Sequence, residues 1–406
     1  EKKNALRNLF KNSKVAFIYG AAGTGKSTMI NYISSLFKDK QKIFLANTNP
    51  AVENLRRKVT AEHAEFVTIT KFLSKDVSND CDILCLDECS TISNRDMVRV
   101  LQRAQCKLLV LVGDIYQIES ILFGNWFNIA YKVMPKDSVA ELTRPHRTTV
   151  QGLIEVWNKV REITEDRLEF ITRNGLSSTL DESIFSRTEE DEIVLCLNYD
   201  GIYGINNINK FLQSNNVNPS INWGVLSYKV GDPVLFNESN RFAPLVYNNL
   251  KGKILQIEEE EDCIYFTIEV YTVLNELDVI GFDLELKESV TDETSVIRFK
   301  VGRGGDGNDD NDNVENVVPF QVAYAISIHK AQGLEYESVK VVITSEIEEM
   351  VSHNIFYTAI TRAKSKLKIY WSPETEKRIL ENMKVQFNDK DYQLFKAKYK
   401  EALLKS

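Results

Sequence analysis

A glycine-rich segment near the start of the chain combines residue types that can bind the phosphates of a nucleotide. Residues 20–28 read Gly-Ala-Ala-Gly-Thr-Gly-Lys-Ser-Thr, which contains the pattern Gly-x4-Gly-Lys-Ser. Glycines let the backbone fold around phosphate oxygens with several N–H groups pointing inward, and Lys26 supplies a positive charge for the β- and γ-phosphates. Ser27 offers its hydroxyl to Mg²⁺. The candidate residues for binding ATP are Gly20, Gly23, Thr24, Gly25, Lys26, Ser27 and Thr28.

The elements on either side of this segment are those that such a loop needs. The apolar run at residues 15–19 predicts a buried strand, and the apolar residues within 29–37 recur at the spacing of a helix. A loop between a strand and a helix places the partly positive N-terminal end of the helix next to the phosphates. A glycine-rich turn that binds nothing is the alternative, and the flanking strand and helix argue against it. The sequence therefore predicts a P-loop that binds ATP with Mg²⁺.

Two other apolar runs end in polar residues that can act on a triphosphate. The run at residues 81–86 ends in Asp87 and Glu88. Because parallel strands end at the same edge of a sheet, we expect these carboxylates beside the P-loop. There Asp87 can hold Mg²⁺ through water, and Glu88 can orient and deprotonate the attacking water. The run at 108–112 is followed by Gln117, which can contact the γ-phosphate; a solvated loop glutamine is the alternative.

The composition is that of a globular chain with room for two or three domains. Of its 406 residues, 43% are hydrophobic and 27% are charged, and the net charge is −8. A negative net charge disfavours a uniformly basic surface but is compatible with a basic stripe inside a cleft. No apolar run approaches the roughly 20 residues of a membrane helix, so no membrane partner is expected. Because the chain starts at Glu1 rather than Met, we expect that an upstream segment is missing.

Three of the six cysteines, Cys81, Cys85 and Cys89, are evenly spaced. A metal cluster is one interpretation of that spacing. Zinc sites use closer ligand pairs, and Cys85 falls within an apolar strand, so we interpret these residues as small buried thiols. Reduced thiols fit a cytoplasmic protein.

The order of the motifs resembles that of superfamily 1 helicases. Residues 20–28, Asp87-Glu88 and Gly113-Asp114-x-x-Gln117 are similar to motifs I, II and III of that family. Residues 323–335, which read AYAISIHKAQGLE, resemble motif V, and residues 354–364, which read NIFYTAITRAK, resemble motif VI. Within motif V, the sequence His-Lys-Ala-Gln-Gly is similar to that of the RecD-like and Dda-like branch, superfamily 1B. The overlapping sequence Gly-Leu-Glu is also similar to that of UvrD-like enzymes.

The resemblance implies roles for residues of the second half of the nucleotide site. Residues 141–147 resemble motif IV, whose arginine is then Arg147, with Arg144 as the less favoured candidate. Arg147 and Arg362 correspond to arginine fingers, which spread positive charge over the transferring phosphoryl group. His146 falls where the family can stack an aromatic ring on adenine. Two more positions near the ribose or phosphates are Gly333 and Glu335.

The resemblance also implies contacts to the phosphates of a bound nucleic-acid strand, at Thr48, Asn49, Thr68 and His329. For Thr48 and Asn49 taken alone, a helix cap is the simpler interpretation. Phe72 and Trp126 are candidates for stacking on bases, and core packing is the preferred interpretation of both.

The expected fold class is α/β, with two RecA-like P-loop domains built on parallel sheets. Short strands separated by turns, from about residue 231, predict a small β-barrel, and the family carries an SH3-like insertion at this place. The expected boundaries are 1–148 for the first RecA-like domain, 149–230 with 317–372 for the second, 231–316 for the SH3-like insertion, and 373–406 for a charged helical tail.

The resulting function is an ATP-dependent translocase or helicase on single-stranded nucleic acid, moving 5′ to 3′ by family likeness, with DNA favoured over RNA. Only about ten residues, 74–82, separate the Thr68 segment from the motif II strand, which leaves little room for a pin that splits a duplex. We therefore expect translocation rather than unwinding of long duplexes.

Two alternative functions are considered. One is an ATP-switched nucleic-acid-binding module of a larger defence or repair protein, completed by an upstream domain or partner protein. The other is a small-molecule kinase. Motifs V and VI argue against the kinase.

Overall fold

The computed structural model describes residues 14–74, 78–117, 124–143, 146–237, 241–243, 245–289, 291–302, 316–384 and 389–405. Arg144, the less favoured candidate for the motif IV arginine, lies outside these residues. Within them, none of the helices combines the length and the apolar character needed to cross a membrane.

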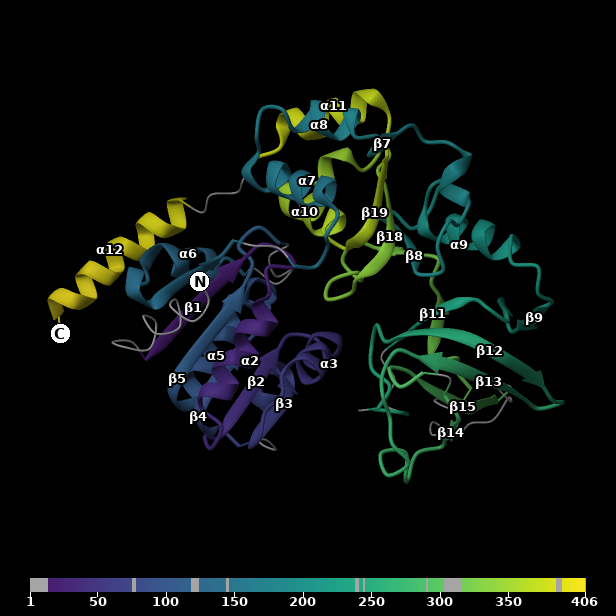
Figure 1. The fold of residues 1–406 in the computed structure, drawn as a ribbon, viewed down its shortest axis with the longest axis horizontal. Coiled ribbons are helices and arrows are strands. Elements are labelled where there is room, and N and C mark those ends of the chain that lie inside the picture. The colour runs from purple at the N-terminus through teal and green to yellow at the C-terminus, as the bar shows by residue number, and fades with distance from the viewer. Residues whose placement is uncertain are drawn as a thin grey trace.

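The first α/β unit is built on a six-stranded parallel sheet with the strand order β3-β2-β4-β5-β1-β6 (Figure 1). Its strands are β1 (Val15–Gly20), β2 (Lys42–Ala46), β3 (Ala64–Thr68), β4 (Asp80–Leu86), β5 (Gln105–Gly113) and β6 (Val139–Leu142). Continuous apolar runs form these strands because a parallel sheet is covered on both faces. The order places the carboxyl ends of β1, β4 and β5 side by side, which is where the P-loop and the predicted carboxylates follow.

Helices cover both faces of this sheet. One face carries α2 (Lys26–Leu36) and α3 (Asn49–Lys58), and the other carries α4 (Ile69–Leu73), α5 (Asn94–Arg103) and α6 (Trp126–Val133). Phe72 of α4 is fully buried in the second of these cores. Cys85 and Cys89 are buried as well, and within the described part of the chain no group of three or more His, Cys, Asp or Glu residues is arranged to hold a metal ion.

The second α/β unit has a five-stranded parallel sheet in the order β17-β8-β18-β19-β7. Its strands are β7 (Ser177–Ser178), β8 (Glu192–Cys196), β17 (Ala325–Ser327), β18 (Tyr336–Val342) and β19 (Ala363–Tyr370). The larger core packs this sheet against α7 (Gln151–Glu162), α8 (Arg167–Arg173), α10 (His353–Ile360) and α11 (Pro373–Asn382), while α9 (Ile205–Ser214) covers the other face. Two stretches of the chain, residues 177–196 and 325–370, therefore build one sheet, although a separate unit of β-strands lies between them in the sequence.

The β unit lies between β8 and β17 in the chain and is an antiparallel sheet in the order β14-β15-β13-β12-β11-β16. Its strands are β11 (Pro233–Phe236), β12 (Lys251–Glu259), β13 (Cys263–Val270), β14 (Glu285–Lys287), β15 (Ser295–Gly302) and β16 (Phe320–Val322), preceded by the hairpin of β9 (Ser220–Trp223) and β10 (Leu226–Lys229). A turn with Asn249 at φ 64° leads into β12. Buried aromatic rings, among them Phe236, Phe266 and Phe299, fill its core.

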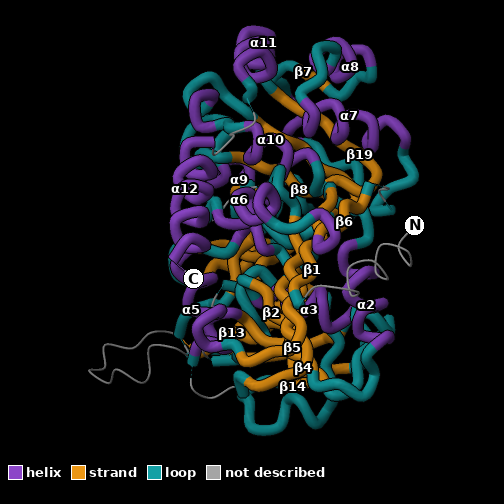
Figure 2. Tube along the Cα trace, turned by 90° about the vertical axis from the view of Figure 1, so that its left-hand side faces the viewer, coloured by secondary structure: helices purple, strands orange, loops and turns teal. Residues whose placement is uncertain are grey.

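The C-terminal helix α12 (Asp389–Lys405) lies against α6 of the first α/β unit, as both Figure 1 and Figure 2 show. The Asn125 amide donates a hydrogen bond of 2.6 Å to Asp391, and the Lys132 ammonium lies 5.4 Å from the centre of the Tyr392 ring. The chain thus passes from the second α/β unit back to the first at its end, which the sequence pattern did not indicate.

Candidate nucleotide-binding site

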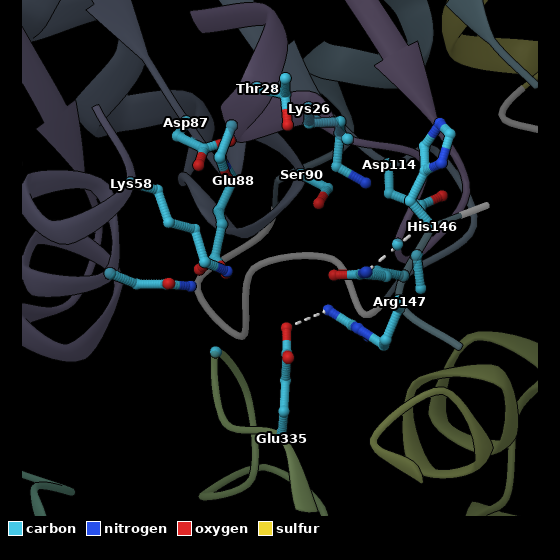
Figure 3. A pocket seen from close by; sticks show the side chains of 18 of the residues that line it. Lys26, Thr28, Lys58, Asp87, Glu88, Ser90, Asp114, His146, Arg147 and Glu335 are labelled. Atoms are coloured by element: carbon cyan, nitrogen blue, oxygen red, sulfur yellow. Dashed lines mark hydrogen bonds and ion pairs between the residues drawn. The ribbon is translucent and has the colours of Figure 1, made fainter. Parts of the chain in front are cut away.

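A cavity of about 240 Å³ lies where the first and second α/β units meet (Figure 3). The P-loop and the ends of β4 and β5 line it from the first unit, and the segments around Glu335 and Arg362 line it from the second. Thirteen of the residues predicted from the sequence are brought together here: Gly23, Gly25, Lys26, Ser27, Thr28, Asp87, Glu88, Gln117, His146, Arg147, Gly333, Glu335 and Arg362.

Two predicted P-loop residues, Gly20 and Thr24, do not line the cavity but shape the loop from behind. A Cβ at Gly20 would come within 2.6 Å of a backbone oxygen at the end of β6. The buried Thr24 hydroxyl donates 2.9 Å to the carbonyl three residues earlier. Gly23 has a φ of 74°, and a Cβ there would lie 2.4 Å from the Cβ of Arg147. Glycine at this position therefore lets Arg147 approach the loop backbone directly.

Lys26 lies at the first turn of α2 and points into the loop. Its Nζ donates to the carbonyl oxygens of Gly20 at 2.8 Å and Ala21 at 3.0 Å. Burial lowers the pKa of Lys26, while the carboxylates of Asp114 and Asp87 favour the charged form. A lysine held in this way can exchange carbonyl oxygens for phosphate oxygens without leaving the loop.

The carboxylates at the ends of β4 and β5 sit in an environment that disfavours their charge. Burial is the largest cause of the raised pKa values of Asp87 and Asp114. Burial, together with the neighbouring Asp87, also raises the pKa of Glu88 to about 7. A carboxylate whose pKa is close to neutral is suited to accept a proton from water and to release it later. Glu88 also has a φ of 52°, a left-handed conformation that non-glycine residues seldom adopt and that is found at functional sites.

Ser27 and Asp87 are a donor set that fits Mg²⁺ bound together with a triphosphate. Mg²⁺ prefers oxygen ligands and keeps several waters, so one hydroxyl and one carboxylate suffice when phosphate oxygens complete the shell. Both residues line the same cavity, and the buried Asp87 gains from a nearby cation because its charge is otherwise desolvated.

Arg147 bridges the two sides of the cavity from the segment that joins the two units. Its Nη2 lies 2.6 Å from Glu335 Oε1, and its Nη1 donates 2.6 Å to the carbonyl of Thr361. Burial works against ionisation of Glu335, but the combined charges of Arg147, Lys58, Lys364 and Arg362 outweigh it, and the pKa of Glu335 falls to about 2. Glu335 is therefore ionised throughout the neutral pH range. Figure 3 shows this contact as a dashed line across the lower part of the cavity.

Arg362 is buried at the end of α10, where backbone oxygens hold its guanidinium. It donates to the carbonyls of Thr358 at 2.9 Å and Leu334 at 3.3 Å. Burial and the neighbouring Arg147 lower its pKa to about 10, so it stays charged at neutral pH, with Glu88 and Glu335 as its opposite charges. A buried arginine that faces Glu88 from the other unit can stabilise negative charge that develops on a phosphoryl group.

Gln117 and His146 also line the cavity. The Gln117 amide donates 3.3 Å to Asp114, which fixes it near the end of β5. The backbone N–H of His146 donates 2.5 Å to the carbonyl of Gly23, and its side chain is exposed. These contacts place the motif IV segment on the P-loop.

The residues predicted to contact nucleic acid lie outside this cavity, at the ends of strands. Thr48 and Thr68 cap α3 and α4, because their hydroxyl oxygens accept hydrogen bonds from Ala51 N at 3.4 Å and Lys71 N at 3.2 Å. A capping hydroxyl uses its oxygen and keeps its proton free to donate. Asn49 is the first residue of α3, and His329 lies half-buried in the turn after β17. Trp126 is half-buried, and its indole N–H donates 2.9 Å to the carbonyl of Ile92.

Ser90 lines the cavity but was not named in the sequence analysis, and the same is true of two residues of α3, Asn54 and Lys58. They are four residues apart on α3 and therefore share one face, while the face formed by Ala51, Val52 and Leu55 is buried in the core. In Figure 3 the Lys58 side chain points into the cavity on the side of Glu88. The four-residue spacing could have indicated a common polar face, but not what it faces.

Parts of the chain match known protein families, and longer stretches of it are similar to known proteins. Residues 1–181 match the AAA domain family, and residues 322–370 match the UvrD-like helicase C-terminal domain family. An uncharacterized protein of Methanocaldococcus jannaschii, MJ1519, is 24% identical over 89% of this chain, which spans 37% of the length of that relative. The RecBCD enzyme subunit RecD of Mycolicibacterium smegmatis is 21% identical over 95% of this chain and 73% of its own length. The ATP-dependent DNA helicase Pif1 of Campylobacter jejuni is 23% identical, over 87% of this chain and 88% of its own length.

Solved structures of Pif1 helicases share the fold. The crystal structure of Pif1 helicase from Candida albicans superposes with a TM-score of 0.54 at 19% identity and covers 94% of this chain and 96% of its own. Pif1 helicase from Bacteroides, in complex with ADP-AlF3 and single-stranded DNA, gives a TM-score of 0.54 at 17% identity and covers 92% of each chain. The two α/β units are thus arranged in a fold that resembles these helicases.

Proposed function

Because the chain belongs to the RecD- and Pif1-like branch of superfamily 1 helicases, superfamily 1B, we propose that it is an ATP-driven motor that moves along single-stranded DNA. One observation carries this proposal. Lys26 and Glu88 of the first α/β unit and Arg362 of the second line a single cavity, and Arg147 crosses it. Hydrolysis at such a site depends on how close the two units are, which is what a motor requires.

The residues of the cavity divide the hydrolytic step among them. The P-loop amides and Lys26 bind the phosphates, and Gln117 contacts the terminal one. Glu88 accepts a proton from the attacking water, whose oxygen bonds to the γ-phosphorus while the bond to the β–γ bridging oxygen breaks. Arg147 and Arg362 stabilise the charge that develops on the γ-phosphoryl oxygens. Mg²⁺, held by Ser27 and Asp87, would neutralise charge on the β- and γ-phosphates.

The remaining roles proposed for the nucleotide site concern the base and the sugar. His146 is exposed next to the P-loop, where its ring can stack on adenine, and Glu335 with Gly333 lies on the opposite wall, near the ribose or phosphates. Since Glu335 is paired with Arg147 in this structure, binding of nucleotide would redistribute that pair.

The proposed track is single-stranded DNA, which crosses the carboxyl ends of both parallel sheets. Thr48, Asn49 and Thr68 lie at that edge of the first sheet, and His329 lies just after β17 of the second. A structurally similar helicase, Pif1 from Bacteroides, has been crystallised bound to single-stranded DNA, which favours DNA over RNA as the track. Likeness to superfamily 1B favours 5′ to 3′ movement.

We propose domain boundaries that follow this function. The first RecA-like domain spans residues 1–148, and the second spans residues 149–230 together with 317–372. The SH3-like insertion spans residues 231–316, and the helical tail spans residues 373–406. The antiparallel sheet within the insertion and its aromatic core support the assignment. RecD relatives are named as subunits of the RecBCD enzyme, which supports a partner protein or a further domain for this chain.

We also propose that translocation outweighs duplex unwinding. α4 ends at Leu73 and β4 begins at Asp80, and no helix or strand lies between them in the described part of this connection. A connection of this length has no room for the pin that splits a duplex ahead of some related motors.

Displacement of streptavidin from biotinylated oligonucleotides tests the proposed movement. With ATP, a 5′ to 3′ motor removes streptavidin from a 3′ end and leaves it on a 5′ end. The Glu88→Gln variant, which binds nucleotide without hydrolysing it, is the matched control. Binding of DNA that depends on ATP but gives no displacement at either end would instead identify a switched binding module.

A further inference from the structure

A tyrosine of the second α/β unit is hydrogen-bonded to the P-loop of the first. Tyr357 lies on α10 and is fully buried. Its hydroxyl oxygen accepts a hydrogen bond of 3.3 Å from the backbone N–H of Ala22, the third residue of the P-loop. Backbone N–H groups of a P-loop are the groups that bind phosphates. One of them is therefore committed here to a side chain from the other half of the motor.

The ring of Tyr357 is also part of the contact between the two units. Tyr116, two residues after Asp114 of motif III, lies with its ring centre 6.4 Å from that of Tyr357 and 6.2 Å from that of His353. The Arg161 guanidinium of α7 lies 5.7 Å from the centre of the Tyr116 ring. Tyr116 thus contacts residues of both α7 and α10, so that the P-loop and motif III both contact α10.

The position of α10 is fixed within the second unit. The Trp157 indole of α7 donates 3.0 Å to the carbonyl of Ile360, and a ring nitrogen of His353 lies 2.8 Å from the carbonyl of Val160. Because α10 is held at both ends, it moves with the second unit rather than independently. A hydrogen bond from the P-loop to α10 therefore depends on the position of the whole second unit.

The same helix presents Arg362 to the cavity. Arg362 follows Tyr357 by five residues, and its Nε donates 2.9 Å to the carbonyl of Thr358 on α10. The distance between the Tyr357 hydroxyl and the Arg362 guanidinium is therefore set by the helix. When the hydroxyl is bonded to Ala22, Arg362 stands at a defined place relative to the P-loop.

We propose that Tyr357 is a positioning residue of the motor. Its hydroxyl fixes the position of α10 relative to the P-loop. Movement of the second unit along a DNA strand therefore brings both the P-loop backbone and Arg362 into the positions needed for hydrolysis. This inference rests on the proposed function. Burial, with a contribution from Asp114, raises the pKa of Tyr357, so the hydroxyl stays neutral and the bond does not titrate in the working pH range.

The test is Tyr357→Phe, which removes the hydroxyl and keeps the ring. Tyr228→Phe is the matched control, because the Tyr228 hydroxyl is buried in the core of the β unit and makes no hydrogen bond with any residue that the structure describes. We expect Tyr357→Phe to lower the DNA-stimulated kcat by roughly twofold to tenfold, the range that one hydrogen bond supports, while the ATP KM changes far less. Tyr228→Phe should leave both at wild-type values.

Two results would overturn the inference while leaving the proposed function intact. In the first, wild-type protein is stimulated by DNA and Tyr357→Phe has the same stimulated and unstimulated rates as wild type. In the second, the variant loses both rates in equal proportion, as general damage to the fold would cause. A wild-type protein that no strand stimulates would contradict the proposed function instead.

Hydrogen exchange gives a second readout that does not depend on turnover. In wild-type protein without nucleotide, binding of single-stranded DNA should change exchange of the peptide that contains residues 20–24. In Tyr357→Phe this peptide should exchange faster from the start and respond less to DNA. Equal exchange in the two proteins, with and without DNA, would refute the link between Tyr357 and the P-loop.

Discussion

Arg147 and Glu335 form an ion pair of 2.6 Å across the cavity, although 188 residues separate them in the chain. The second arm of the Arg147 fork donates to the carbonyl of Thr361, so one side chain holds two segments of the second α/β unit next to the P-loop. A planar fork with fixed donors can do this, whereas a lysine ammonium is a point charge. The pair shows that the two halves of the site are assembled by charge as well as by packing.

Replacement of Arg147 should therefore affect turnover more than stability. We expect Arg147→Ala to lower kcat by about 10²-fold or more, in line with arginine fingers of P-loop enzymes, and Arg147→Lys to recover only a small part of it. Arg99→Ala is the control, since Arg99 is exposed on α5 and pairs only weakly with Asp96. Steady-state ATPase assays make the comparison. A kcat near the wild-type value in Arg147→Ala would remove this residue from the catalytic step.

The pH dependence of hydrolysis should follow Glu88. A general base acts only when deprotonated, and the pKa of Glu88 is raised to about 7. The competent fraction therefore rises with pH, and kcat/KM should increase by about tenfold between pH 6 and pH 8. Glu88→Gln should abolish both the activity and its pH dependence while retaining ATP binding. A profile that is flat or falls over this range would contradict the role of Glu88 as the base.

Lys58 should contribute to nucleotide binding from α3. Its side chain lines the cavity, and its charge acts on both Asp87 and Glu335. We expect Lys58→Ala to raise the ATP KM by roughly threefold to tenfold, as the loss of one charge-assisted contact would. Arg56→Ala, on the exposed side of the same helix, should leave it unchanged. Equal KM values in the two variants would show that Lys58 does not reach the nucleotide.

Thr48 can be tested for contact with DNA without disturbing the helix that it caps. Asp and Asn both replace Thr as an N-cap, so Thr48→Asp and Thr48→Asn should each keep α3 stable. Only Asp places a negative charge beside a phosphate. We expect Thr48→Asp to weaken binding of single-stranded DNA at low salt by about tenfold or more, and Thr48→Asn by much less. Equal affinities, measured by fluorescence anisotropy, would place the strand elsewhere.

The parts of the site that are tied to local sequence could be predicted from it. The P-loop needs glycines between a strand and a helix, and Asp87-Glu88 needs the end of an adjacent strand, so residue type and spacing indicate both. The parallel sheets follow from continuous apolar runs. Arg147, Glu335 and Arg362 are brought into the cavity by the fold, and their motifs indicated this through family resemblance rather than through spacing.

What the sequence did not predict depends on contacts between distant segments. Lys58 looks like one of three basic residues at the end of a solvated helix, and its neighbours Arg56 and Arg57 are exposed. Tyr357 looks like a core aromatic of α10, which it is, apart from a hydroxyl that reaches Ala22. The docking of α12 on α6 rests on polar contacts such as Asn125 with Asp391, which leave no periodic pattern. Such partners become visible only when the two units are placed together.

The most direct test of a DNA-dependent motor is ATP hydrolysis with and without single-stranded DNA, with single-stranded RNA of the same sequence and the Glu88→Gln variant measured in parallel. We expect strong stimulation by DNA, weaker stimulation by RNA, and no hydrolysis by the variant. A rate that neither strand changes, in protein that binds ATP normally, would contradict it.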